Sequence, residues 1–195
     1  MDDVRGELGQ LARTFDSMAE SLQQRASERL EVEKLLLRRA QQQTVVAALG
    51  QFAMVSSDFN ALLNQTTQLI AQTLDLPFIH VLELQGDNES LLLRSGLGWK
   101  NGRVGSNTFK VRGRSQAGFV LNSGEPLVIP DLRAEHHFIA PPLLIEHGIL
   151  SGVCVTISTR HRPYGVLGAY ATTARKYSED EVQFLLAVAN VLGMA

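Results

Sequence analysis

Cysteine is nearly absent from this sequence: Cys154 is the single cysteine among 195 residues. One thiol excludes a disulfide within the chain and is typical of a reducing compartment. No run of 18 or more uncharged apolar residues occurs, so the sequence predicts no bilayer-spanning helix. The N-terminal stretch MDDVRGELGQ is acidic and polar, unlike a signal peptide. We therefore expect this chain to lie in the cytoplasm.

An excess of basic charge is also missing. The chain has 18 Lys and Arg against 20 Asp and Glu, a formal net charge of -2. This balance argues against a nucleic-acid partner, because such partners are usually bound through a basic face. No Walker loop, GxGxxG, HExxH or GxSxG motif occurs, so no nucleophile stands beside a base in a known catalytic pattern. The sequence therefore predicts no enzyme activity for this chain.

Proline is absent from residues 1–55, and glycine occurs there only three times. The same segment is rich in Leu, Ala, Gln, Glu and Arg, which are strong helix formers. All six prolines lie beyond residue 76. This division predicts a long helix over residues 1–55, followed by a domain of mixed helices and strands.

Apolar residues in the long helix recur at spacings of 3 and 4 from Leu8 to Leu22, which is typical of a coiled-coil seam. Two spacings of 4 then follow through Ala26 to Leu30, a stutter that locally unwinds a coiled coil. A helix of this length extends about 80 Å and exceeds the width of the domain, so we expect the seam to pair with the same helix of a second copy. An amphipathic helix packed on its own domain is the alternative. The predicted seam is Leu8, Leu11, Phe15, Met18, Leu22, Ala26, Leu30 and Leu37.

The domain itself begins with an expected helix capped by Ser57 and Asp58, and ends with a helix whose capping box is Ser178 and Glu181. The stretch between Gly113 and Leu132 predicts a short helix, ended by a left-handed residue at Ser123 or Gly124, and then a short edge strand. Alternation of aliphatic with small residues predicts one aliphatic face and one weakly polar face for the strand over 151–158. The other expected strands cover residues 78–84, 90–95 and 164–171.

The N-terminal helix resembles the second helix of a HAMP domain. In GELGQLARTFDSMAESL, Glu7, Gly9, Leu11, Phe15 and Met18 match the HAMP pattern, whereas Gly6 and Asp16 replace its Asp and Asn. The following ASERLEVEKLLLRRAQQQ resembles the signalling helices that couple HAMP domains to later modules. The resemblance implies the cytoplasmic portion of an inner-membrane receptor. It divides the chain into half a HAMP module (1–24), a signalling helix (25–55) and a domain (56–195).

The remainder resembles a GAF domain. The phrases that carry the resemblance, in order, are RSQAGFVLNSGEPLVIPDL, PPLLIEHGILSGVCVTI, RPYGVLGAY and YSEDEVQFLLAVANVL. It implies an α+β fold with a central antiparallel sheet of about six strands flanked by helices. It also implies that the short helix after Gly113 forms a lid over a small-molecule pocket. The same residues can instead fill a plain core without a cavity. The expected pocket walls are Leu82, Phe119, Phe138, Ile139, Cys154, Thr156 and Tyr170.

No cofactor or metal is assigned. Cys154 lies within a strand and lacks the neighbouring His of bilin-binding relatives, so we expect a buried thiol and no covalent bilin. The Asn-Lys…Phe…Asp-Glu signature of cyclic-nucleotide GAF domains is missing. His136 and His137 are adjacent and point apart, which argues against a shared metal. One of these histidines, or His80, could still face the pocket and bind an anion or haem.

The expected function is therefore a non-catalytic sensory module. It would bind an unidentified small molecule, form homodimers through its N-terminal and C-terminal helices, and pass signals to a histidine kinase or a diguanylate cyclase. One alternative is a purely structural dimerisation module without a ligand. A remote alternative is an enzyme like the GAF-fold methionine-sulfoxide reductases, which use several cysteines.

Overall fold

The computed structural model describes residues 2–100, 102–111, 115–136 and 138–195, and within the first helix it describes the side chains of Met18 and of residues 21 onward. The chain divides into two compact units, Met1–Gln41 and Gln42–Ala195. Each unit is described by itself. None of the described helices is both long enough and apolar enough to cross a membrane.

Helix α1 (Asp2–Val55) is continuous, which confirms the long helix predicted from the missing prolines. Within the first unit, Met18, Leu22, Leu30 and Leu37 of the expected seam each leave more than half of their surface exposed. Ala26 is exposed as well. Leu8, Leu11 and Phe15 lie outside the described side chains. The homodimer along this seam stays a prediction.

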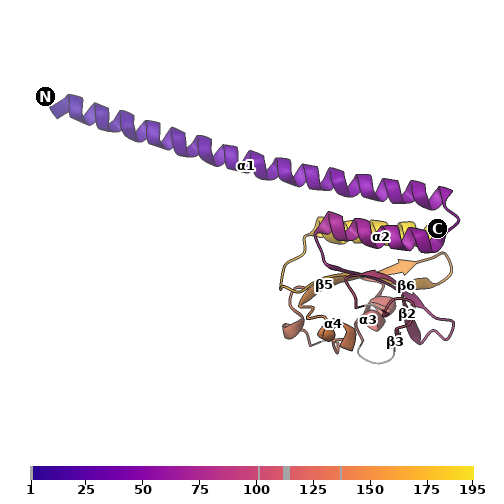
Figure 1. The fold of residues 1–195 in the computed structure, drawn as a ribbon. Coiled ribbons are helices and arrows are strands. Elements are labelled where there is room, and N and C mark those ends of the chain that lie inside the picture. Colours follow the sequence, from indigo (N-terminus) through magenta and orange to yellow (C-terminus); the bar gives the residue numbers. More distant parts are fainter. Residues whose placement is uncertain (1, 101, 112–114, 137) are drawn as a thin grey trace. The chain divides into compact units, whose positions relative to one another are not determined.

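The second unit is built on a six-stranded sheet in the order β3-β2-β1-β6-β5-β4, with every neighbouring pair antiparallel. This confirms the expected α+β fold with an antiparallel sheet of about six strands between helices (Figure 1). The short strand β3 lies outside the sequence predictions. The strands are β1 (Phe78–Leu84), β2 (Ser90–Leu97), β3 (Thr108–Lys110), β4 (Leu127–Ile129), β5 (Ser151–Ser158) and β6 (Pro163–Ala171).

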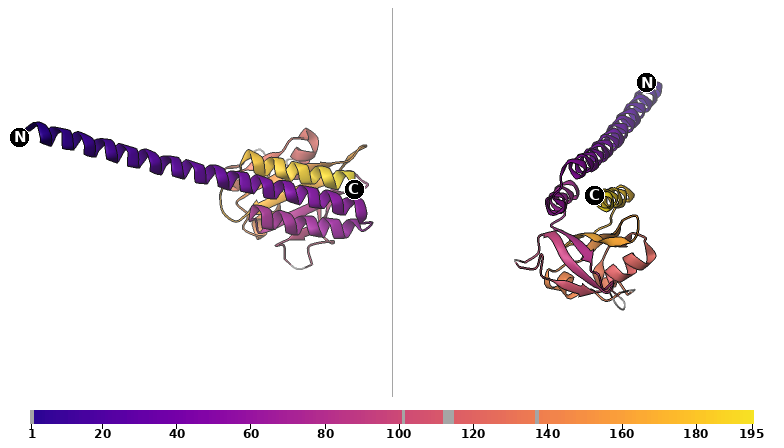
Figure 2. Two further views of the ribbon diagram at one scale, coloured as in Figure 1. Left: turned by 90° about the horizontal axis from the view of Figure 1, so that it is seen from above. Right: turned by 90° about the vertical axis from the view of Figure 1, so that its right-hand side faces the viewer.

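One face of the sheet is covered by α2 (Phe59–Leu74) and α5 (Glu179–Met194), which lie side by side (Figures 1 and 2). The end of α1 joins this layer, because Leu49 is fully buried in the same core cluster. The strand β5 contributes Val153, Val155 and Ile157 to that cluster. The helical layer therefore closes an aliphatic core, as the alternation in β5 predicts.

The other face carries α3 (Gln116–Ser123), the 3-10 helix η1 (Leu132–Ala134) and α4 (Pro142–Glu146). Their core is separate and includes Cys154 and Tyr170 on the small-residue side of the strands. The lid helix α3 begins at Ser115, whose Oγ accepts the N–H of Gly118 at 3.1 Å. It ends at Gly124 with a φ of 70°, the left-handed residue expected at this point.

The caps predicted from the sequence are present. Asp58 accepts the N–H groups of Asn60 and Ala61 at 2.9 and 3.1 Å and starts α2. Ser178 and Glu181 form the full capping box of α5. These contacts are local, which is why sequence spacing alone predicted them.

Candidate functional site

A cavity of about 460 Å³ lies on the sheet face that carries α3 and α4. Its floor comes from β1, β5 and β6, and its walls come from β3, the start of α3 and the segment leading into α4. This volume falls within the range of about 300–1,000 Å³ that is typical of small-molecule sites. The lining residues are His80, Leu82, Thr108, Phe109, Lys110, Ser115, Gln116, Ala117, Ile139, Ala140, Pro141, Pro142, Leu143, Leu144, Cys154 and Tyr170.

The structure brings together only part of the expected pocket wall. Leu82, Ile139, Cys154 and Tyr170 line the cavity.

Phe119, Phe138 and Thr156 do not line it. Phe119 lies on the outer side of α3 and is 43% exposed, because Gln116 and Val120 occupy the buried side of this helix. Phe138 is buried but is not among the residues that line the cavity. The Thr156 hydroxyl donates to the carbonyl oxygen of Val120 at 2.9 Å and so ties α3 to β5.

Four buried polar side chains form a hydrogen-bonded cluster on the cavity floor. The amide Nε2 of Gln116 donates to Cys154 Sγ at 3.1 Å and to Tyr170 Oη at 3.2 Å. Tyr170 Oη lies 2.8 Å from Cys154 Sγ and 3.2 Å from Nε2 of His80. The cluster therefore joins the lid helix to three neighbouring strands.

Two glycines make room for this cluster on the sheet. Gly168 lies between His80 of β1 and Cys154 of β5 in the strand register. A Cβ atom at Gly168 would lie 2.5 Å from both His80 Nε2 and Tyr170 Oη. A Cβ atom at Gly152 would lie 2.2 Å from the Tyr170 ring. Both positions must therefore lack a side chain for the tyrosine to lie across the strands.

Burial keeps every member of the cluster neutral at pH 7. Desolvation lowers the pKa of His80 to about 3. Desolvation also raises the pKa of Cys154 to about 12 and moves the pKa of Tyr170 well above its ordinary value. An un-ionised, buried thiol is a poor nucleophile, which agrees with the expectation that Cys154 is a buried structural thiol. The floor is therefore polar but uncharged.

The His80 ring is clamped by aromatic neighbours. Trp99 stacks on it with ring centroids 5.7 Å apart, and the Trp99 indole N–H donates to the carbonyl oxygen of Ile79 at 2.7 Å. His80 Nδ1, in contrast, has no hydrogen-bond partner although the side chain is buried. Within the described part of the chain, the other such buried polar atom is Oγ1 of Thr66.

Sequence reasoning missed Gln116 as a site residue. A polar residue in the first turn of a helix is usually exposed, so its type alone gave no signal. Its position four residues before Val120, with Gly118 between them, places it on the buried side of α3. This spacing could have identified it.

The described ranges contain no group of three or more His, Cys, Asp or Glu side chains arranged to hold a metal ion. His137 lies outside them.

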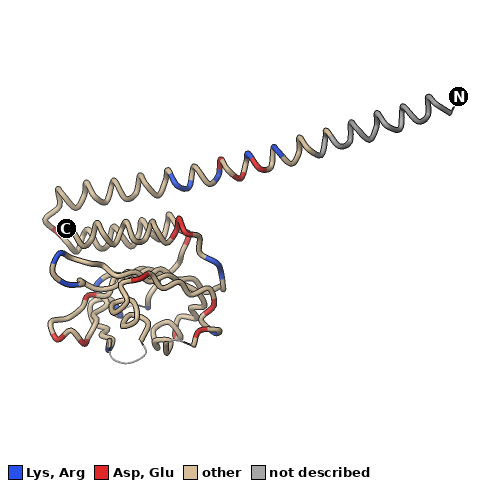
Figure 3. The backbone as a smooth tube through the Cα atoms, turned by 180° about the vertical axis from the view of Figure 1, so that it is seen from behind, with Lys and Arg blue, Asp and Glu red and all other residues tan. Residues whose placement is uncertain are grey.

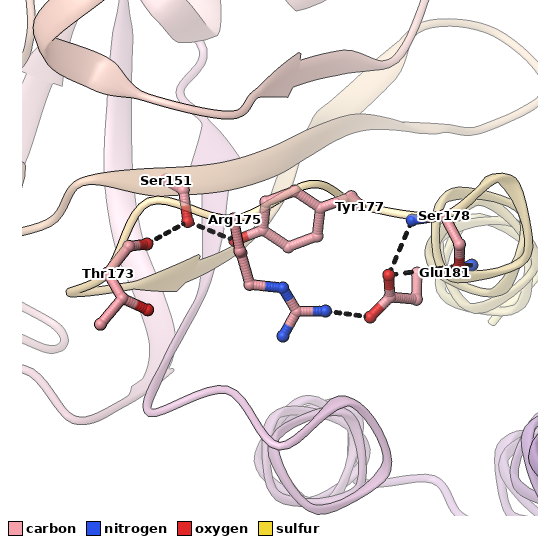
Figure 4. A network of polar contacts seen from close by, with 6 residues as sticks. All are labelled: Ser151, Thr173, Arg175, Tyr177, Ser178 and Glu181. Atoms are coloured by element: carbon pink, nitrogen blue, oxygen red, sulfur yellow. Dashed lines mark hydrogen bonds and ion pairs between the residues drawn. The ribbon is translucent and has the colours of Figure 1, made fainter.

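A second polar network lies where the chain enters α5 (Figure 4). Arg175 forms an ion pair with Glu181, and its guanidinium lies 4.6 Å from the centre of the Tyr177 ring. The N–H of Arg175 donates to the carbonyl oxygen of Pro130 at 3.1 Å. This arginine therefore links the segment after β4 to the first turn of α5.

The same network reaches the sheet through Ser151, the first residue of β5. The Ser151 hydroxyl donates to the carbonyl oxygen of Thr173 at 2.7 Å and accepts from the Tyr177 hydroxyl at 3.0 Å (Figure 4). Tyr177 in turn precedes Ser178, the N-cap of α5. The start of α5 is thus bonded to the sheet by side chains as well as by packing.

The helical layer has a surface with very little charge. No Lys, Arg, Asp or Glu occurs from residue 40 to residue 57 or within α2, and α5 is charged only in its first turn (Figure 3). Met54, Val55 and Met194 are each at least 80% exposed there. An uncharged surface with exposed apolar side chains is typical of a protein interface.

The second unit matches one protein family model and resembles several solved structures. The family model described as the GAF domain matches residues 58–195. The GAF domain of a phosphoenolpyruvate-protein phosphotransferase from Coxiella burnetii superposes with a TM-score of 0.72 at 16% identity, covering 80% of this chain and 92% of that chain. The corresponding domain from Acinetobacter gives a TM-score of 0.69 at 19% identity, covering 78% and 90%.

A free methionine-R-sulfoxide reductase from Neisseria meningitidis, solved in complex with its substrate, gives a TM-score of 0.65 at 19% identity, covering 80% of this chain and 87% of that chain. Comparison with curated protein sequences gives no match. At these low identities, the structural likeness concerns the fold alone.

Proposed function

The chain belongs to the GAF domain family, a family of sensory and signalling modules, and from this premise we propose that it senses a small molecule in the cavity beneath α3. The observation that carries the proposal is the cavity itself, with its mostly apolar walls and its uncharged polar floor. Pockets of this kind, with a few convergent polar groups, are typical of small-molecule sites.

Binding would be relayed through α5. Gln116 joins the lid helix to the cavity floor, and Thr156 and Val120 join the same helix to β5. Strand β5 begins at Ser151, which belongs to the network that holds the first turn of α5. A ligand that displaces α3 would therefore act on a strand bonded directly to α5.

We infer that the chain works as a homodimer. Two surfaces support this: the exposed apolar seam of α1 around Leu22 and Leu30, and the uncharged helical layer around Met54 and Met194. Each is an apolar helix surface of a kind that pairs with the same surface of a second copy. Analytical ultracentrifugation of the full chain tests this, and a monomer at micromolar concentration would contradict it.

The HAMP-like N-terminus supports a place within a larger receptor. In this proposal, α1 receives a rotation or splaying from a membrane-bound HAMP domain, and the output is a histidine kinase or a diguanylate cyclase. Inserting two residues next to Ala26, at the stutter, would turn the following helix by about 200°. The expected result is altered output of the complete receptor, and unchanged output would contradict the relay.

A reductase activity is the least supported function. Cys154 is the single cysteine of the chain, is buried, and has a pKa raised to about 12 by desolvation. A reductase that resolves its intermediate through a second thiol cannot operate with one. The expected result is no turnover of free methionine sulfoxide, measured by loss of the sulfoxide with dithiothreitol as the reductant. Measurable turnover would overturn the non-catalytic function.

Native mass spectrometry of the freshly purified chain is the decisive test of sensing. A co-purified small molecule at one per chain supports the proposed function. A chain that carries no molecule, and that binds none from a metabolite library, would instead support the alternative of a purely structural dimerisation module.

A further inference from the structure

His147 directly follows α4 and uses both nitrogens of its ring in hydrogen bonds. Nδ1 lies 2.8 Å from the carbonyl oxygen of Leu143, and Nε2 lies 3.0 Å from the backbone nitrogen of Lys100. A carbonyl oxygen can only accept, so Nδ1 must carry a proton. A backbone N–H can only donate, so Nε2 must be the acceptor. The two partners together assign a neutral imidazole with its proton on Nδ1.

The bond to Lys100 joins two segments that lie far apart in the sequence. His147 ends α4, whose Leu143 and Leu144 line the cavity, and Lys100 follows Trp99 in the connection between β2 and β3. The rings of His147 and Trp99 are also in contact, with centroids 5.0 Å apart. This histidine therefore holds a part of the cavity wall against the β2–β3 connection.

The imidazole after α4 has several charged or titratable neighbours in the described chain. Glu146 on α4 forms an ion pair at 2.6 Å with Arg103 of the β2–β3 connection, which also contributes Lys100. Strand β1 contributes the uncharged Phe78 ring and His80, whose pKa is lowered to about 3 by burial. Carboxylate, ammonium and guanidinium groups ordinarily keep their charge between about pH 5.5 and 7.5, whereas an ordinary histidine changes its charge there.

Protonation of His147 would remove the acceptor of this bond. An imidazolium carries a proton on both nitrogens, so its Nε2–H would face the N–H of Lys100, and two donors would meet without an acceptor. We propose that His147 is a pH-sensitive latch, which holds α4 to the β2–β3 connection as a neutral ring and releases it as a cation. The bond requires the neutral form, so the latch is closed at about pH 7.5 and opens as the pH falls through about 6.

The latch itself requires no ligand. Its effect on sensing rests on the proposed function, because α4 supplies Leu143 and Leu144 to the cavity wall. Once released, α4 would hold this wall less firmly, and the cavity would bind its ligand less tightly at low pH. Acidity would then regulate the same site.

Amide hydrogen exchange of Lys100, measured by NMR on the full chain, tests the latch. Relative to its intrinsic rate at each pH, this amide should exchange about tenfold faster at about pH 5.5 than at about pH 7.5, because it loses its acceptor. Nitrogen-15 NMR of the His147 imidazole at the higher pH should show the proton on Nδ1. A proton on Nε2, or equal protection of Lys100 at both pH values, would overturn the proposal.

Two variants identify the histidine that is responsible. His147→Phe keeps an aromatic ring beside Phe78 and Trp99 but offers Lys100 no acceptor, so the Lys100 amide should be equally unprotected at both pH values. His161→Phe is the matched control, since His161 is exposed between β5 and β6, and it should keep the wild-type pH dependence. The wild-type measurements decide the question even where His147→Phe fails to fold.

Trp99, the single tryptophan of the chain, reports whether the β2–β3 connection is released. Its side chain is 8% exposed, so the uncharged quencher acrylamide should quench its fluorescence more strongly at the lower pH. His161→Phe should behave like the wild type. Unchanged quenching in the wild type would show that the connection stays in place, and would overturn the latch.

The outcomes separate the latch from the proposed function. If the protection of Lys100 does not depend on pH, the latch fails and the cavity remains the proposed ligand site. If Lys100 is released at low pH but no molecule co-purifies with the chain or binds to it at neutral pH, the sensory function fails and the latch stands.

Discussion

The two faces of the sheet use the same strands for opposite purposes. In β5, Val153 and Val155 face the helical layer and fill an aliphatic core, whereas Cys154 between them faces the cavity. The helical face is closed by long helices, while the cavity face is covered by α3 and by the five-residue α4. We therefore expect the helical face to contribute more to the free energy of unfolding than the cavity face, which contains a polar cluster and an open volume.

The largest expected effect lies on the helical face. Leu63→Ala should lower the free energy of unfolding by about 3 kcal/mol, because Leu63 is fully buried in the aliphatic core. Leu143→Ala, beside the cavity, should cost about 1–2 kcal/mol, since its surroundings are already open on one side. Urea denaturation of both variants measures the difference. Equal losses would show that the two faces contribute alike.

A glycine comparison tests whether the cavity face is tightly built where its polar cluster lies. Gly168→Ala should destabilise the protein by about 2 kcal/mol, because the new methyl group would collide with His80 and Tyr170. Gly50→Ala is the matched control, since no atom lies within 4 Å of its added Cβ. It should stabilise the helix by about 0.5–1 kcal/mol. Thermal unfolding measures both, and a neutral Gly168→Ala would contradict the cluster geometry.

The pH dependence of stability tests the neutrality of the cavity floor. The pKa of His80 is lowered by burial from 6.5 to about 3, so between these pH values the unfolded chain binds a proton that the folded chain does not. Stability from this group is complete above pH 6.5 and falls as the pH decreases, by up to about 1.4 kcal/mol per pH unit.

Subtracting the profile of His80→Phe isolates this contribution from that of the carboxylates. Denaturant unfolding of both proteins between about pH 7 and pH 5 measures it. Parallel profiles would mean that His80 titrates near its ordinary pKa and that the floor carries charge.

The smallest expected effect on stability concerns the polar network of Arg175 at the start of α5. Arg175→Met removes the ion pair with Glu181 and the contact with the Tyr177 ring, and should cost about 1 kcal/mol because both carboxylate and guanidinium are largely shielded. Lys34→Met in the solvent-exposed pair with Glu31 should leave the free energy of unfolding almost unchanged. Urea denaturation at low and high salt measures the loss of unfolding free energy in both variants. Equal losses would show that the network at α5 stabilises the protein no more than an exposed ion pair does.

Local features were predictable because their causes are local. The missing prolines predicted α1, and the spacing of Ser178 and Glu181 predicted the cap of α5. The alternation in β5 predicted its two different faces. The site was predictable only in part: apolar character placed Phe119 in the pocket wall, but the roll of α3 turned this side chain outward and Gln116 inward.

By itself, the sequence determined helices α1, α2, α3 and α5 and the strands other than β3. It also determined that the β5 strand separates an aliphatic face from a small-residue face. Those outcomes depend on propensity, periodicity and capping within a few residues. Only the tertiary structure decided that Gln116, Cys154, Tyr170 and His80 meet across a helix and three strands, over Gly168. Strand register and burial produce that meeting, and they also leave His80 Nδ1 without a hydrogen-bond partner.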